Sequence, residues 1–258
     1  MIRVCVAGAT GWTGGAVAEA VAAADDLTLT SAVSRSAAGG GIAGAPVYAS
    51  VSQALDGVDV LVDYTSHEVV KDHVLTAILR GVHVVIGSSG LSAEDFDEIR
   101  AQAEEASVGV IAAGNFSLTA AMAQAAATLA ARYLPSWEII DYASAGKTDA
   151  PSGTSRELAE RLSGVRPPEV AVPVETTAGH VEARGATIGA TQVHSVRLPG
   201  FSVSTEVVFG LPDERLVIRH DAGSTAAPYV AGTLLAVRRA PHVTGLVRGL
   251  DTLLLQGD

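Results

Sequence analysis

The segment Lys147–Thr154 places a cation, a turn and a predicted helix start close together. Lys147 precedes a Pro/Ser/Gly turn, and the pattern predicts a helix over Thr154–Leu162. Backbone N–H groups and the positive end of the helix dipole gather at a helix start, so an anion binds there readily. A lysine beside such a site can attract an anionic substrate and donate a proton. A capped surface helix is the alternative interpretation.

A glycine-rich turn near the N-terminus predicts a dinucleotide site. A predicted strand, Ile2–Ala7, leads into this turn, and an alanine-rich helix is predicted over Ala16–Ala24. Glycines in such a turn allow close approach of the backbone to a pyrophosphate and close packing of helix on strand. The residues predicted to contact the cofactor here are Gly8, Thr10, Gly11, Trp12, Thr13 and Gly14. A tight turn without a ligand is the alternative.

The end of the second predicted strand indicates which cofactor is used. An acidic residue there binds the adenosine ribose, whereas an arginine accommodates a 2′-phosphate. The chain has Ser34 and Arg35 at this place and no acid. This favours NADPH, with NADH possible, although Arg35 could also be a solvated loop charge.

Three further turns follow predicted strands and are expected at the same crevice. Ligands of doubly wound sheets bind outside the carboxyl ends of the strands. The cofactor contacts predicted in these turns are Tyr64, Thr65, Gly87, Ser88, Ser89, Asn115 and Phe116.

The elements that must position these residues alternate along the first half of the chain. Strands are predicted at Ile2–Ala7, Leu27–Val33, Val58–Tyr64, His83–Gly87, Val108–Ala113 and Glu138–Tyr142. Helices are predicted at Ala16–Ala24, Val69–Gly81, Ala93–Glu105 and Ala120–Arg132, and Ser92 with Asp95 indicates a capping box. Such alternation predicts an α/β fold with a Rossmann-type, doubly wound parallel sheet.

The second half has a different pattern. Strands at Gln192–Leu198, Ser204–Phe209 and Arg215–Asp221 follow one another closely, which predicts antiparallel pairing. They indicate a second, C-terminal α+β domain. We expect residues 1–117 to form the dinucleotide-binding domain, joined by the C-terminal helix of about 226–258, and residues 118–225 to form the second domain.

Composition narrows the function classes. The net charge of −11 argues against a nucleic-acid partner, because neutralising phosphates needs an excess of Lys and Arg. Apolar runs are too short for a membrane span or a signal peptide. A single cysteine among 258 residues and the absence of His-x-x-x-His spacing predict no metal site. The cytoplasm is the expected location.

Taken together, these motifs resemble the dihydrodipicolinate reductase family over the whole chain, and its actinobacterial type in particular. The run from Lys147 to Thr154 is the most specific of them. The resemblance implies that the C-terminal domain has a mixed sheet, binds the substrate and builds a homotetramer, and that the two domains close on each other. It further implies hydride transfer from NAD(P)H to a cyclic unsaturated dicarboxylate. It also implies that Lys147 helps to supply a proton and that Gly153 and Thr154 hold a substrate carboxylate.

The chain departs from the family pattern just before the lysine. The family typically carries Glu-x-His-His-x-His-Lys, whereas this chain has Asp141-Tyr142-Ala143-Ser144-Ala145-Gly146-Lys147. The loss of a general acid typically lowers a rate by a factor of about 10²–10⁴. The family also has an arginine soon after the residue matching His220, which this chain lacks. These changes predict a substrate with less negative charge than a dicarboxylate.

The sequence therefore predicts an NADPH-dependent reductase of a cyclic imine or a conjugated C=C–C=N carboxylate, a paralogue with an altered substrate. Lys147 is the predicted catalytic residue, and the predicted substrate contacts are Ser144, Lys147, Ser152, Gly153 and Thr154. Three alternatives remain: the authentic 4-hydroxy-tetrahydrodipicolinate reductase of lysine biosynthesis, a catalytically silent NADP(H)-binding protein, and a non-redox enzyme that uses the lysine.

Overall fold

The chain divides into two units in the computed structural model, which describes residues 1–255. The first unit comprises Met1–Leu118 together with Ala226–Asp258, and the second, inserted unit comprises Thr119–Thr225. The end of the predicted C-terminal segment, residues 256–258, lies outside the described residues. No helix among the described residues is long and apolar enough to cross a membrane.

An eight-stranded sheet forms the centre of the first unit, in the order β13-β7-β6-β5-β1-β2-β4-β3. All neighbouring strands are parallel except the β3–β4 hairpin. The strands are β1 (Ile2–Ala7), β2 (Leu27–Val33), β3 (Gly41–Ile42), β4 (Ala45–Tyr48), β5 (Val60–Asp63), β6 (His83–Ile86), β7 (Gly109–Ala112) and β13 (Gly245–Arg248). The predicted doubly wound sheet is therefore confirmed.

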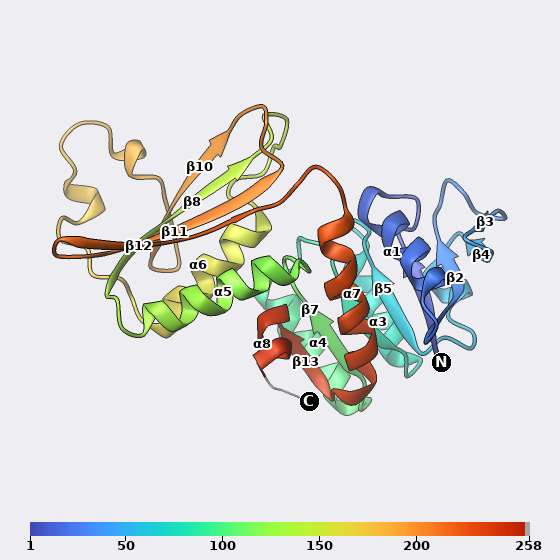
Figure 1. Cartoon of the computed structure of the whole chain (residues 1–258). Coiled ribbons are helices and arrows are strands. Elements are labelled where there is room, and N and C mark those ends of the chain that lie inside the picture. Colours follow the sequence, from blue (N-terminus) through green and yellow to red (C-terminus); the bar gives the residue numbers. More distant parts are fainter. Residues whose placement is uncertain (256–258) are drawn as a thin grey trace. The chain divides into compact units, whose positions relative to one another are not determined.

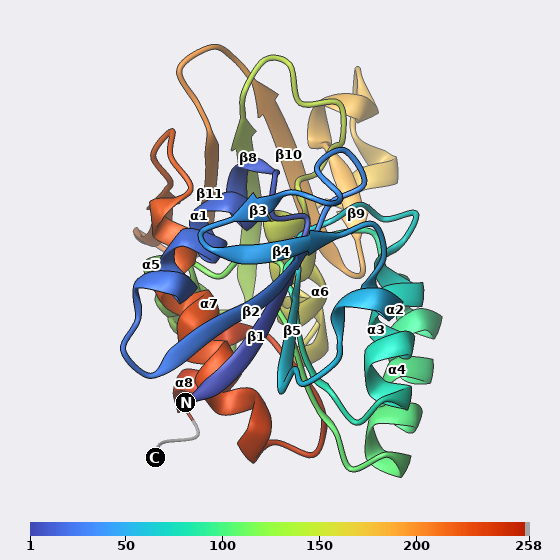
Figure 2. The same ribbon diagram turned by 90° about the vertical axis from the view of Figure 1, so that its right-hand side faces the viewer.

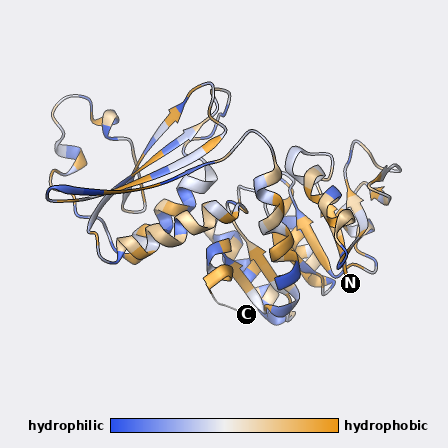
Figure 3. Ribbon diagram, in the orientation of Figure 1, coloured by the Kyte–Doolittle hydropathy of each residue, from blue (hydrophilic) through white to orange (hydrophobic). Residues whose placement is uncertain are grey.

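Helices cover both faces of this sheet because its inner strands are apolar on both sides. The helices are α1 (Trp12–Ala23), α2 (Val51–Ala54), α3 (Val70–Leu79), α4 (Ala93–Glu105), α7 (Ala227–Arg239) and α8 (Leu250–Leu255). Helices α1 and α7 lie on one face, and α2, α3 and α4 lie on the other (Figures 1 and 2). The strands carry the hydrophobic colours in Figure 3, and Val4, Val6 and Val62 are fully buried.

Three local predictions for the first unit need correction. Helix α1 begins at Trp12, not Ala16, because the tight turn ends at Gly11 and the chain becomes helical at once. Strand β5 spans Val60–Asp63 and is shorter at both ends than the predicted Val58–Tyr64. The chain after α7 is not one long helix, since it adds strand β13 to the edge of the sheet beside β7. The capping box at Ser92 and Asp95 is confirmed.

The inserted unit has a five-stranded sheet in the order β12-β11-β8-β10-β9. Its strands are β8 (Ser136–Ala143), β9 (Ala186–Ile188), β10 (Thr191–Arg197), β11 (Val203–Leu211) and β12 (Glu214–Asp221). Helices α5 (Leu118–Ala131) and α6 (Gly153–Val165) bury one face of this sheet. Burial alternates along β8, with Trp137, Ile139 and Asp141 on the helix-covered face.

The pairing of β10 differs from the sequence prediction. Strands β11 and β12 form the expected antiparallel pair, but β10 is parallel to β8 and has no pairing with β11. Strand β8 lies between them, antiparallel to β11. Closeness in sequence suggested that β10 and β11 were neighbours. Every second residue of β8 is buried, which suits a strand at the centre of the sheet. Strand β12, by contrast, is largely exposed and forms an edge.

Candidate functional site

The glycine-rich turn between β1 and α1 is shaped for close backbone approach. Gly8 has φ of +80°, and a Cβ on it would overlap the Tyr64 carbonyl group. A Cβ on Gly14 would overlap the Gly8 carbonyl group. Gly11 is the N-cap of α1, no side chain caps this helix, and its first turn holds no acid. The positive end of α1 is therefore presented to an anion.

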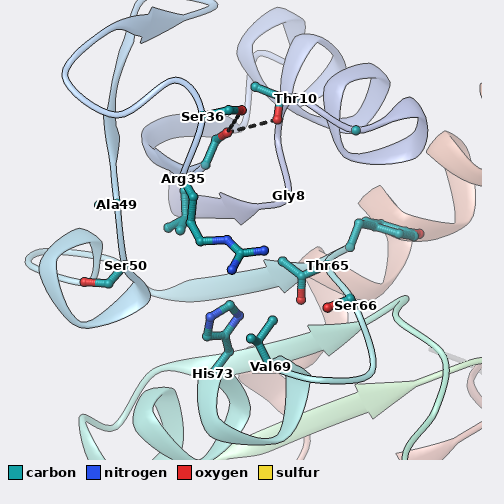
Figure 4. Close-up of a pocket in the computed structure, with 14 residues that line it drawn as sticks. Gly8, Thr10, Arg35, Ser36, Ala49, Ser50, Thr65, Ser66, Val69 and His73 are labelled. Carbon is teal, nitrogen blue, oxygen red and sulfur yellow. Dashed lines mark hydrogen bonds between the residues drawn. The ribbon is translucent and has the colours of Figure 1, made fainter.

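A hollow of about 420 Å³ lies beside this turn, at the carboxyl ends of β1, β2 and β5 (Figure 4). We call it the Arg35 hollow. The predicted cofactor residues that line it are Gly8, Thr10, Gly11, Ser34, Arg35, Tyr64 and Thr65. The sequence analysis missed other lining residues, chiefly Ser36, Ser50, Ser66, Val69 and His73. Hydroxyl groups next to a predicted phosphate-binding arginine were the available signal for Ser36.

The predicted selectivity residue Arg35 projects into the hollow without a protein partner. Within residues 1–255 its side chain forms no ion pair or hydrogen bond, and Figure 4 shows its guanidinium directed toward Thr65 and His73. Hydroxyl groups border it: Thr10 Oγ1 lies 2.9 Å from Ser34 Oγ, which lies 3.2 Å from Ser36 Oγ. An exposed cation with hydroxyl donors beside it is a fitting receptor for a phosphate group.

A buried carboxylate, Asp63, organises the wall of the hollow. It lies at the end of β5 and is fully buried. Its Oδ1 accepts hydrogen bonds from the Thr65 amide (3.0 Å), the Thr65 hydroxyl (2.6 Å) and the Ser88 hydroxyl (2.6 Å). Its Oδ2 lies 2.8 Å from His73 Nδ1. Asp63 therefore fixes two loops and one helix at the carboxyl edge of the sheet.

Several predicted cofactor residues do not line the hollow but support it. Ser88 bonds to Asp63 and also accepts from the Thr65 amide at 2.7 Å. Gly87 needs to be glycine because a Cβ would overlap the Tyr64 ring. Phe116 is buried, with its ring edge-on to Tyr64 at 6.3 Å between centroids. The side chains of Ser88 and Phe116 thus hold neighbouring residues in place.

The remaining predicted cofactor residues, which do not line the hollow, lie partly on exposed and partly on buried positions of the first unit. Trp12 is 58% exposed and lies edge-on to Tyr229 of α7, with ring centroids 5.8 Å apart. Thr13 lies in the first turn of α1. Ser89 is exposed in the loop after β6. Asn115 is buried and accepts a hydrogen bond from the Ser117 amide at 2.8 Å.

In the inserted unit, Lys147 lies in a tight turn after β8. Its amide donates to the Ser144 carbonyl oxygen at 3.1 Å, and its Nζ lies 2.7 Å from Asp149 Oδ1. The Lys147 side chain is 29% exposed, and Ser144 is exposed. The lysine is therefore accessible, and its charge is partly offset by a carboxylate two residues away.

A second buried carboxylate, Asp141, ties this turn to the start of α6. Its Oδ1 accepts from the hydroxyls of Ser152 (2.5 Å) and Ser155 (3.0 Å), and its Oδ2 accepts from the Ser152 amide (3.0 Å) and the Ser195 hydroxyl (3.1 Å). Arg197 donates to Oδ2 at 2.8 Å and to the Asp149 carbonyl oxygen at 2.7 Å. The sequence analysis noted Asp141 only as a departure from the family's glutamate and missed this network.

Burial of Asp141 disfavours its charged form, but its hydrogen bonds more than offset that effect. The donors are Ser152, Arg197 and Ser155, and together they hold the pKa of Asp141 below its ordinary value. Asp141 is therefore an anion at neutral pH and a fixed counter-charge for Arg197.

This network leaves the start of α6 without a side-chain cap. Ser152 is the N-cap residue, yet its hydroxyl bonds to Asp141 and not to the helix, and the first turn contains no acid. A Cβ placed on Gly153 would meet no atom within 4 Å, whereas the side chains of Ser152 and Thr154 are buried. In the predicted carboxylate site, the backbone at Gly153 therefore faces open space, whereas the Ser152 hydroxyl is bonded to Asp141.

Both units match models of one known protein family. The family model "Dihydrodipicolinate reductase, N-terminus" matches residues 2–116, and "Dihydrodipicolinate reductase, C-terminus" matches residues 114–254. The chain belongs to the dihydrodipicolinate reductase family. The resemblance found in the sequence is confirmed, and family membership makes the chain an NAD(P)H-dependent oxidoreductase.

Full-length relatives agree with this assignment. The chain is 40% identical to the 4-hydroxy-tetrahydrodipicolinate reductase of Synechococcus elongatus, with 98% of both proteins covered. It is 37% identical to the protein of that name from a Mycobacterium species, over 98% of this chain and 99% of the relative.

Solved structures give the same fold. A dipicolinate-bound dihydrodipicolinate reductase from Paenisporosarcina matches with a TM-score of 0.82 and 28% identity, covering 98% of this chain and 99% of that one. GenD2 from gentamicin A biosynthesis, solved in complex with NAD, matches with a TM-score of 0.66 and 15% identity, covering 97% of this chain and 89% of that one. The latter similarity concerns the fold alone.

Proposed function

We propose that this dihydrodipicolinate reductase family member uses NADPH to reduce a cyclic imine or a conjugated C=C–C=N carboxylate, and that its substrate carries less negative charge than a dicarboxylate. The observation that carries this proposal is the pairing of two cations beside the Lys147–Thr154 segment, Lys147 and Arg197. Lys147 pairs with Asp149, and Arg197 pairs with Asp141. A carboxylate of the protein thus already offsets each of these two charges, which weakens their attraction for a second carboxylate on the substrate.

The first unit supplies the features that a dinucleotide needs. The uncapped start of α1 and the glycine turn suit a pyrophosphate, and Arg35 with Ser34 and Ser36 suits a 2′-phosphate. When bound, NADPH supplies the hydride. We accordingly propose residues 1–117 and the returning C-terminal segment as the dinucleotide-binding domain, and residues 118–225 as the substrate domain.

The inserted unit supplies a receptor for one carboxylate. The start of α6 has no side-chain cap and no acid in its first turn, so its dipole and the open backbone at Gly153 favour an anion. The Asp141–Ser152 bonds fix the orientation of this helix start. Substrate binding would therefore depend on Asp141 even though its buried side chain does not face the substrate.

Lys147 is the candidate proton donor. Reduction of a C=N or conjugated bond adds a hydride at carbon and consumes one proton. The positions that hold histidines in the family carry Ala143, Ser144 and Gly146, and Ala143 is fully buried. None of these three can act as an acid at neutral pH. The ammonium group of Lys147, which lies 2.7 Å from Asp149 and is partly exposed, can donate a proton and regain one from solvent.

Authentic 4-hydroxy-tetrahydrodipicolinate reductase activity is the second candidate. It is favoured by the names of the relatives, of which the Synechococcus protein is 40% identical along its length. The two candidates share the cofactor and the carboxylate receptor, and they differ in the number of charges on the substrate.

Steady-state kinetics with NADPH separates the two candidates. We expect kcat/KM to be higher for cyclic imines with one carboxylate than for 4-hydroxy-tetrahydrodipicolinate. Lys147→Met should lower kcat by about a hundredfold, the lower end expected for removal of a general acid. Glu175→Gln, an exposed change in the same unit, is the matched control. Faster turnover of the dicarboxylate would overturn the altered-substrate proposal and leave the reductase assignment in place.

We also propose a homotetramer and a cytoplasmic location. The face of the second sheet opposite the helices has a hollow of about 910 Å³, lined in part by Ile140, Val196 and Val208. Exposed Val170 and Val172 lie beside it, and an apolar concavity of this kind suits a second copy of the chain. Sedimentation velocity measures the assembly.

The cytoplasmic location is supported by the one cysteine, Cys5, which is free and buried, in keeping with a reducing compartment.

A further inference from the structure

His73 is a titratable group in the Arg35 hollow for which the reductase assignment provides no role. It lies on α3, ten residues after Asp63 along the chain, and the hollow lies between α3 and the end of β2. Figure 4 shows the imidazole ring and the Arg35 guanidinium facing each other across the hollow. Arg35 and His73, which are far apart in the sequence and can both carry a positive charge, thus border the same hollow.

The bond to Asp63 fixes the orientation and tautomer of this ring. His73 Nδ1 lies 2.8 Å from Asp63 Oδ2, and the other carboxylate oxygen is already held by Thr65 and Ser88. With an ionised carboxylate as its partner, Nδ1 is the nitrogen that carries the proton and donates. Nε2 remains as the nitrogen that can take up a second proton, and the ring is 19% exposed where it borders the hollow.

Few other charges face this ring. From β5 there is Asp63, and from the loop after β2 there is Arg35. Helix α2 has no titratable residue, and on α4 the acids Asp95 and Glu98 pair with Lys71. Protonated His73 and Arg35 would repel each other across an empty hollow, and a doubly charged phosphate between them would remove that repulsion.

We infer that His73, oriented by Asp63, is the second cationic arm of a 2′-phosphate site whose first arm is Arg35, so that the preference for NADPH over NADH depends on pH. This inference rests on the proposed use of NADPH. A protonated ring donates a charge-assisted bond from Nε2 to the phosphate, whereas a neutral ring with its proton on Nδ1 presents only a lone pair there. NADH lacks the phosphate and gains nothing from it.

The test compares dissociation constants of NADPH and NADH for the full-length protein at about pH 6 and about pH 8. The measured quantity is the ratio of the NADH constant to the NADPH constant. His73→Asn keeps an amide donor at the Nδ1 position for Asp63 but removes Nε2. The second ionisation of the phosphate itself, near pH 6, affects wild type and variant alike and cancels when they are compared. His180→Asn, an exposed change in the other unit, is the control.

We expect the wild-type ratio to exceed the His73→Asn ratio about tenfold at the lower pH, and the two ratios to converge at the higher pH. Arg35→Ala should lower the ratio at both pH values. The ratio should still depend in part on pH, because His73 remains at the site. Equal ratios for wild type and His73→Asn at both pH values would overturn the inference. An equal loss of both cofactors in His73→Asn would also overturn it, because the ring would then contact a shared part of the dinucleotide. Failure of wild type to bind either cofactor would instead overturn the proposed function.

Discussion

Each unit of the molecule contains one buried aspartate on which several donors converge, and the two networks differ in their cation. Asp141 of the inserted unit is bonded to the guanidinium of Arg197, which stays charged at any physiological pH. Asp63 of the first unit is bonded to the imidazole of His73, which unlike a guanidinium is a cation only when protonated, and otherwise to neutral donors from Thr65 and Ser88.

This difference shows that a buried aspartate can serve two purposes. A carboxylate paired with a permanent cation is a structural anchor, and Asp141 holds the turn after β8 and the start of α6 in one geometry. A carboxylate paired with a histidine at the wall of a hollow can instead transmit pH to a ligand site. The substrate side is therefore expected to be insensitive to pH near neutrality, and the cofactor side to be sensitive.

The largest expected effect comes from Asp141→Asn. It leaves Arg197, whose side chain is 17% exposed, without its counter-charge, and breaking a buried pair typically costs about 3–5 kcal/mol of unfolding free energy. Urea denaturation measures this loss, with Glu175→Gln as control. Because the pKa of Asp141 is lowered in the folded state, its contribution is present above the pKa of the unfolded chain and is lost as pH falls through the folded value. A wild-type stability that stays constant into strong acid would contradict this account.

Asp63→Asn should have a smaller effect on stability. The amide oxygen still accepts from Thr65 and Ser88, and no permanent cation loses its partner, so we expect a loss of about 1–3 kcal/mol. The same urea experiment applies, with Glu105→Gln on α4 as the control in this unit. A loss equal to or larger than that of Asp141→Asn would show that the two networks do not differ as described.

The smallest effect concerns one histidine in each unit. Burial lowers the pKa of both His83, whose Nδ1 accepts from the Gly109 amide at 2.9 Å, and His220, whose Nε2 lies 3.1 Å from Thr119 Oγ1. A lowered histidine pKa contributes stability above the unfolded value and loses it as pH falls. Unfolding free energy should thus decline on acidification from pH 7, and His83→Asn and His220→Gln should each flatten the slope. Unchanged slopes would show that neither histidine is linked to unfolding.

Much of the fold followed from local patterns. The apolar strand at Ile2–Ala7 and the helix at Ala93–Glu105 with its capping box have the predicted bounds, because periodicity and capping are encoded by neighbouring residues. The glycine turn was predictable for the same reason, since Gly8 requires a positive φ and the absence of a Cβ. Edge strand β13 was missed because four residues with little alternation give a weak signal.

The candidate site was only partly predictable. Arg35, Ser34 and the helix start at Gly153 could be proposed from residue type and position. The bonds from Arg197 to Asp141 and from His73 to Asp63 could not, since a histidine or an arginine on a strand or helix gives no sign of which distant carboxylate it will contact. Nor could the placement of β8 between β10 and β11, which brings Ser195 and Arg197 beside Asp141.

The sequence by itself determined the family, the class of fold and the two anion-receptive helix starts, because each depends on residues that are near one another in the chain. Only the tertiary structure decided which charges remain available at those helix starts. Beside the start of α6, Arg197 is paired with Asp141 and Lys147 with Asp149, whereas Arg35 stays unpaired within residues 1–255 opposite His73. The physical reason is that the free charge at a site depends on distances between side chains, most of which come from separate strands and helices.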